Sequence, residues 1–228
     1  MKYIILLPGL LLTGILWSSC NNDQQPTEPS TPAREIQEDP VNEQPATDYL
    51  ILPGKQVGAI LPDASESALK KIYGNTQVKT ETRDAGEGTL LPTTLIFPED
   101  ANEAAIIWKD AAGLKNPERI SIRGTQSNWT IDNKIRMGTS LQNLEQLNKK
   151  PFSITGCCFD APYTIVDWNG GELNYMKESG IILRLRPENE SAALKKKIIG
   201  DKSYPVTDSL IQNAGMKVSE MIIRFPGD

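Results

Sequence analysis

A proline-rich acidic stretch, residues 21–48, limits the part of this 228-residue chain that can fold. It contains five prolines, seven acidic residues and one arginine, with hardly an aliphatic residue between them. Such a composition buries too little apolar surface to offset the entropy of ordering, and proline keeps the backbone extended. We expect a disordered tether here, and a folded domain over residues 49–228 that is long enough for a substantial core.

The residues before this stretch have the form of a secretory signal. Lys2 is the only charge, and an apolar run covers residues 3–17. The run is shorter than the roughly 20 residues that span a bilayer, so a cleaved signal is expected in place of a permanent transmembrane helix.

The residues at the expected cleavage site resemble the lipobox of bacterial lipoproteins. Ser18, Ser19 and Cys20 match it, whereas Trp17 replaces the usual aliphatic residue. The resemblance implies a signal peptide over residues 1–19, lipid (palmitate among its chains) on Cys20, and a tether over residues 20–48. It also implies anchoring in the cell envelope, with the outer membrane as the expected location and either face possible.

The charge balance indicates which partners the folded part can have. Residues 49–228 hold 22 acidic and 22 basic residues, so the acidic excess lies in the tether. A neutral domain lacks the excess of basic charge that binds the phosphates of nucleic acid. The acidic tether would be repelled by anionic lipid head groups. No motif indicates a cofactor or a metal site.

The absence of histidine restricts the chemistry. It excludes nucleophile activation by histidine, histidine zinc sites and an imidazole proton shuttle. Carboxylate chemistry, serine–lysine chemistry and oxygen-ligated cations remain possible. Ser67 and Lys70 match the Ser-x-x-Lys pattern of penicillin-binding enzymes, but the accompanying Lys-Thr-Gly and Ser-Asp-Asn motifs are missing. An ordinary helix surface is therefore the favoured interpretation.

Periodicity predicts an α+β fold: an antiparallel sheet with short helices on one face. Helices are expected over residues 66–73 and 141–148, and placing Leu69 on Leu144 aligns the two segments with an offset of 75. We expect Asp63 and Thr139 to cap these helices. The alignment predicts two tandem related units, at about residues 57–130 and 132–228.

Strands and further helices complete the expected fold. Arg184 and Arg186 would share one face of a strand, and Asn169-Gly170 favours a hairpin turn to a following strand. Of the adjacent cysteines, Cys157 and Cys158, one is expected to face the core, and the pair has no assigned role. The expected strands are 78–83, 89–97, 105–109, 118–124, 128–137, 152–159, 163–168, 181–186 and 218–225, with helices at 191–199 and 208–213.

Three segments carry a family resemblance: residues 129–148, Pro151-Phe152 and residues 167–171. They resemble a family of envelope lipoproteins from Bacteroidota-type bacteria that has no assigned activity. At the level of fold, a duplicated helix-plus-sheet unit is similar to the β-lactamase inhibitory protein and to small outer-membrane assembly lipoproteins. That second likeness implies an architecture, and only weakly a function.

A cluster of carboxylates and aromatic residues is the candidate binding surface: Asp160, Tyr163, Asp167, Trp168 and Glu172. Our leading hypothesis is a non-enzymatic lipoprotein that binds an envelope protein or a glycan. One alternative is a glycan hydrolase, since paired carboxylates beside aromatic platforms suit glycoside cleavage. Another is a proteinaceous enzyme inhibitor, motivated only by the fold analogy.

Overall fold

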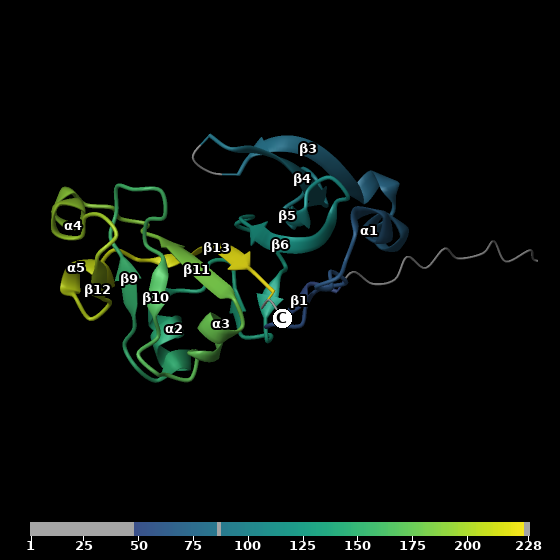
Figure 1. The fold of residues 1–228 in the computed structure, drawn as a ribbon. Helices are drawn as coiled ribbons and strands as arrows, with labels where there is room; N and C mark the ends of the chain where they lie inside the picture. The colour runs from purple at the N-terminus through teal and green to yellow at the C-terminus, as the bar shows by residue number, and fades with distance from the viewer. Residues whose placement is uncertain (1–47, 86–87, 226–228) are drawn as a thin grey trace, which may run out of the picture. The chain divides into compact units, whose positions relative to one another are not determined.

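The computed structural model describes residues 48–85 and 88–225 (Figure 1). It confirms an α+β fold in which antiparallel strands predominate over short helices. The expected signal peptide, Cys20 and nearly all of the tether lie outside the described residues. None of the helices in the described part is long and apolar enough to cross a membrane.

A six-stranded sheet is the largest element of the fold, and every neighbouring pair in it is antiparallel. Two neighbouring strands in it come from distant parts of the chain, and Ser121 of one pairs with Ile222 of the other. The strands, in spatial order, are β11 (Ile181–Arg186), β13 (Lys217–Ile223), β6 (Lys115–Ile122), β5 (Ala104–Asp110), β4 (Leu90–Ile96) and β3 (Val78–Asp84).

Two smaller sheets stand beside it. One contains β2 (Gln56–Val57), β1 (Leu50–Leu52), β7 (Thr130–Ile131) and β8 (Ile135–Arg136), and β1 and β7 pair in parallel. The other contains β10 (Ile165–Asp167), β9 (Ser153–Thr155) and β12 (Ser203–Pro205). The single strand expected over residues 128–137 is instead the hairpin β7–β8, because Asp132 and Asn133 adopt positive φ and reverse the chain.

The two expected main helices are confirmed as α1 (Glu66–Tyr73) and α2 (Leu141–Asn148). Their expected caps are wrong by one or two residues. Ser65 and Ser140 are the N-caps, and each side chain accepts from the N–H three residues later. The Thr139 hydroxyl accepts instead from the Arg136 N–H. Short helices follow at η1 (Asn75–Gln77), α3 (Tyr175–Glu178), α4 (Ala192–Lys197) and α5 (Ser209–Gln212).

The same connection between a helix and a strand occurs twice. The N-caps Ser65 and Ser140 lie 75 residues apart, and each forms a bridge with the first residue of β6 or β13. In the first copy Glu66 N–H donates to Leu114 O and Asn116 N–H donates to Ala64 O, both at 2.9 Å. The second copy repeats this geometry with two bonds of 2.9 Å, between Leu141 and Met216 and between Val218 and Thr139.

The strands that accompany β6 in the first half of the domain and those that accompany β13 in the second half are arranged differently. In the first half β3, β4, β5 and β6 form a continuous meander. In the second half β9 and β10 pair, but β10 meets β11 through the single bridge between Thr164 and Arg184. The small sheet is therefore separated from the large one where the first half has unbroken pairing.

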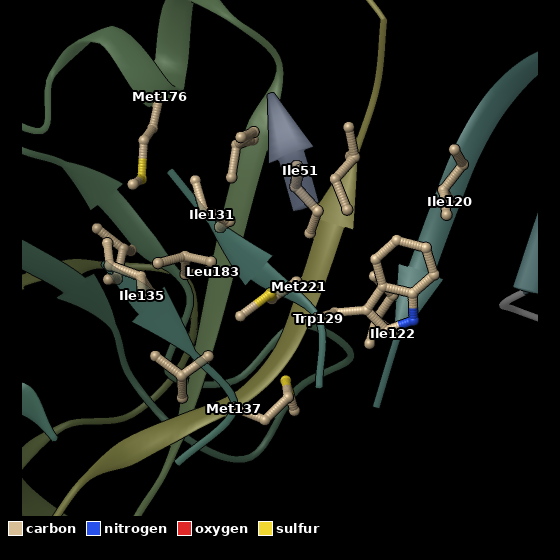
Figure 2. Packing of buried hydrophobic residues seen from close by; sticks show 14 of the residues in the cluster. Ile51, Ile120, Ile122, Trp129, Ile131, Ile135, Met137, Met176, Leu183 and Met221 are labelled. Carbon is tan, nitrogen blue, oxygen red and sulfur yellow. The ribbon is translucent and has the colours of Figure 1, made fainter. Parts of the chain in front are cut away.

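One buried cluster holds the core together, and Trp129 lies within it (Figure 2). Its side chain is fully buried and its indole N–H donates to Asn102 O at 2.9 Å. The Tyr49 ring meets it edge-on with centroids 5.2 Å apart. Gly58, at φ 55°, lies so close that a Cβ there would be 3.0 Å from the indole.

The hairpin expected at Asn169-Gly170 is wrong. Both residues do adopt positive φ, but α3 follows them, and β10 pairs with the preceding strand β9. Buried Asn148 fixes this turn, because its side-chain amide donates to Trp168 O and its carbonyl oxygen accepts from Leu173 N–H. A tertiary hydrogen-bond network therefore directs the chain from this turn into a helix.

Candidate functional site

Arginine side chains gather on the face of the six-stranded sheet that is turned away from the core. Core residues such as Ile120, Leu183 and Met221 alternate along the strands with residues of the opposite face. We call that opposite face, together with Arg224 directly after β13, the arginine face. It carries six of the seven arginines in the described residues: Arg83, Arg119, Arg123, Arg184, Arg186 and Arg224.

A buried carboxylate on β13 lies between two arginines of this face. The Glu220 side chain is only 8 % exposed, and each of its oxygens accepts from a different arginine. Arg123 contacts Oε1 at 2.8 Å and Arg184 contacts Oε2 at 2.9 Å. A buried charge is tolerated only when it is paired and hydrogen-bonded. Glu220 thus holds in fixed positions the guanidinium groups of Arg184 on β11 and of Arg123 directly after β6.

The sheet curls over the arginine face. Arg119 on β6 donates from Nη2 to Ala85 O at 2.8 Å, although β5 and β4 lie between β6 and the end of β3. Strands in a flat sheet are about 4.8 Å apart, so this contact requires the β3–β4 end to bend toward β6. Burial, with the neighbouring Arg224 and Arg123, lowers the pKa of Arg119. The arginine face is therefore concave, and its apolar floor of Leu95, Ile107 and Ile222 is buried.

A groove of about 950 Å³ opens beside β11 and β13, and Arg123, Arg184 and Arg186 of the arginine face line it. Its lining also includes Glu220, Tyr163, Glu188 and Glu190. Lys217 and Glu188, which both line the groove, form an ion pair at 2.5 Å. The groove combines exposed cations with carboxylates that are already paired, which is an arrangement suited to a ligand with negative charge.

Three of these arginines have no carboxylate partner. Within residues 48–85 and 88–225, Arg119, Arg186 and Arg224 form no salt bridge. Arg186 and Arg224 are also exposed. An exposed guanidinium offers paired donors that match the geometry of a carboxylate.

The aromatic residues of the expected binding surface are buried. Trp168 is 3 % exposed and packs on Phe152 with ring centroids 5.0 Å apart. Tyr163 is 5 % exposed, and its hydroxyl donates to Glu190. The expectation of aromatic platforms on this surface is therefore wrong, because both rings are needed to fill the core.

The three expected carboxylates are exposed, and two of them are engaged in local contacts. Asp167 accepts from the Asn169 N–H at 2.8 Å, and Glu172 forms an ion pair with Lys149 at 3.6 Å. Asp160 lies on the exposed part of the turn after β9. Among these five residues Tyr163 alone lines the groove, so the structure offers no groove with Trp168 as its floor.

Other chemistry considered from the sequence has ordinary structural explanations. Lys70 forms a 2.7 Å ion pair with Glu66, and the Ser67 hydroxyl contacts the Ser65 hydroxyl, so Ser67 and Lys70 are engaged separately. Among the described residues no group of three or more cysteine, aspartate or glutamate side chains could hold a metal ion.

Sequence reasoning missed Glu220, Arg119 and Arg123 as site residues. The available signal was the alternation in β11, which places Arg184 and Arg186 on one face. Strand order could not be read from the sequence, so nothing indicated that β6 and β13 would add their arginines to that face.

Two tyrosines, buried Tyr163 and half-buried Tyr175, predict that the folded domain loses stability at alkaline pH. Burial and the hydrogen bond to Glu190 raise the pKa of Tyr163, and burial and the bond to Asp132 (2.6 Å) raise that of Tyr175. Because the unfolded pKa is about 10, stability should be full below that pH and fall as pH rises further. Urea unfolding at several alkaline pH values measures this. A Tyr163→Phe/Tyr175→Phe variant should have the flatter profile, and an equally steep loss in it would contradict the assignment.

Comparisons with models of protein families, with curated protein sequences and with solved structures find no similar protein. The resemblance to envelope lipoproteins stays a prediction, and the arguments about function rest on the geometry of this chain.

Proposed function

We propose that this protein is a lipid-anchored lipoprotein of a bacterial envelope that binds an acidic segment of another envelope protein through the arginine face. The observation that carries the proposal is the concentration of six of seven described arginines on one curved sheet face. Cys20 would hold the lipid, and the tether would supply reach, on the order of 30 Å for a chain of this length.

The composition of the face favours a protein partner. Arginine is enriched at protein interfaces, where its planar group binds carboxylates and its stem packs on apolar surface. Here the arginines surround an aliphatic floor of Leu95, Ile107 and Ile222. Complementary charge would speed encounter with an acidic partner and reject basic ones.

A glycan partner or a glycan hydrolase has less support. Sugar rings are commonly held by exposed aromatic side chains, yet Trp108, Trp129 and Trp168 are all buried. The carboxylates Asp160, Asp167 and Glu172 lack the aromatic groove that the hydrolase hypothesis required. An inhibitor would be the special case in which the acidic partner is an enzyme.

Photo-crosslinking in intact cells tests the proposal. A photoreactive residue at Thr125, which is exposed and lines the groove, should capture one dominant protein. A photoreactive residue at Lys71 on α1, also exposed, is the matched control and should not capture it. Mass spectrometry identifies the captured protein and the peptide that carries the crosslink, which should be acidic.

Charge reversal then separates specific binding from chance capture. Arg186→Glu/Arg224→Glu should reduce the Thr125 crosslink at least tenfold, because loss of two charge-assisted contacts costs about 1.5–3 kcal/mol each. Lys134→Glu/Lys196→Glu makes the same charge change at exposed residues elsewhere and should leave the crosslink intact. An unchanged crosslink in the arginine variant, or retention on cell-wall glycan alone, would refute the proposal.

A further inference from the structure

The two adjacent cysteines lie at the turn after β9. The expectation that one faces the core is confirmed, since Cys157 is buried and Cys158 is exposed. They do not form the extended pair assumed from sequence, because Cys158 adopts φ 69°. In an extended strand neighbouring side chains point to opposite faces. The left-handed backbone instead brings the two Sγ atoms to 2.6 Å, compared with about 2.05 Å in a disulfide.

Backbone hydrogen bonds hold this dipeptide in place. Cys157 N–H donates to Ile198 O at 2.8 Å, and Gly200 N–H donates to Cys157 O at 2.9 Å. Gly156 permits the approach, because a Cβ there would lie 2.7 Å from Ile198 O. The turn is thereby fixed against the end of α4 independently of the sulfur atoms. The geometry that brings the thiols together belongs to the fold.

We propose that Cys157 and Cys158 are a modification site and are joined as a vicinal disulfide in the exported protein. The required oxidant is a disulfide-bearing thiol oxidant, the class that keeps envelope compartments oxidising. The exposed Cys158 thiolate attacks that disulfide, forms a mixed disulfide and releases one thiolate. Cys157, after losing its proton, attacks the Cys158 sulfur and releases the second thiolate. Two electrons pass to the oxidant, which leaves as a dithiol.

The surroundings favour this pairing over others. These are the only cysteines in the described residues, and burial raises the pKa of Cys157, which makes the exposed Cys158 the first to react. Cys157 Sγ also lies 3.5 Å from Lys195 O, and Lys195 pairs with the groove residue Glu190. A disulfide between Cys157 and Cys158 would therefore stiffen the turn that leads to Pro162 and Tyr163 in the lining of the groove. The inference rests on export and not on the arginine face.

Peptide mass spectrometry of the full chain from envelopes tests the inference. Free thiols are alkylated in intact cells before digestion with trypsin. Residues 150–177 form one tryptic peptide, since the Lys150–Pro151 bond resists trypsin, and it contains both cysteines without Cys20. We expect this peptide to be unalkylated and lighter by two hydrogen atoms than the dithiol form. After reduction it should accept two alkyl groups.

The variant Cys158→Ser supplies the control. It should show no loss of two hydrogen atoms, and its Cys157 should take one alkyl group once the chain is unfolded. Two alkyl groups on the wild-type peptide without reduction would overturn the proposal. So would a mixed disulfide between either cysteine and another molecule as the dominant species. The presence of the disulfide is judged on the wild-type chain, so a folding defect in the variant does not affect that result.

Discussion

Replacing Arg184 with methionine is expected to lower the free energy of unfolding by about 2–4 kcal/mol. The change removes the partner of Glu220 Oε2 and leaves a carboxylate that is only 8 % exposed with one remaining arginine. Breaking a buried pair from one side leaves an uncompensated charge, which costs about 3–5 kcal/mol when no other partner remains. Arg123 stays bound to Oε1, so the expected loss is somewhat smaller. Urea denaturation followed by circular dichroism measures it.

Two matched variants make this prediction specific. Arg186→Met is the same change two residues along β11, at an exposed arginine, and should alter stability by no more than about 0.5 kcal/mol. Arg184→Met/Glu220→Leu removes both members of this pair and should recover most of the loss, because apolar groups can replace a buried ion pair. Equal effects of Arg184→Met and Arg186→Met would contradict a structural role for the Glu220 pair.

Replacing Trp129 with alanine is expected to cost about 3–5 kcal/mol of stability. The side chain is fully buried in the cluster that includes Ile51, Ile122 and Ile131 (Figure 2), and its loss would open a large cavity there. The indole N–H also satisfies Asn102 O, which would lose its donor. Many domains of this size have only about 5–15 kcal/mol in total, so partial unfolding at 37 °C is expected.

Trp129→Phe separates the two contributions. It keeps an aromatic ring that fills part of the space and removes the hydrogen-bond donor, and it should cost about 1–3 kcal/mol. Far-UV circular dichroism is the suitable signal, since both variants alter tryptophan fluorescence. If alanine and phenylalanine had the same small effect, the packing role assigned to Trp129 would be wrong.

Local elements of the fold could be predicted because they depend on neighbouring residues. The helices α1 and α2 follow from apolar residues three or four apart, and β11 follows from strict alternation over Ile181–Arg186. The caps were misplaced by one or two residues, since threonine and serine at 139 and 140 are equally good cap residues. The extended backbone of Ser140 and the hydrogen bond from Asn143 N–H to its hydroxyl identify it as the cap.

The candidate site could not be predicted in the same way. Tyr163 and Trp168 have residue types that occur both in binding surfaces and in cores, and burial alone separates the two. In the sequence Glu220 looks like an ordinary strand residue. Its site role arises because β13 lies between β6 and β11 in the sheet. Its role depends on Arg123 and Arg184, which lie 97 and 36 residues away in the chain.

The class of fold, the positions of the main helices and the chemistries excluded by the absence of histidine could all be predicted from the amino-acid sequence. These follow from composition and from the spacing of residues that are close in the chain. The gathering of six arginines on one curved face, the burial of Trp168 in the core and the contact between two adjacent thiols became apparent only in the folded chain. Each of these depends on strand order, on curvature or on a left-handed backbone residue, and such long-range or strained geometry leaves no regular period in the sequence.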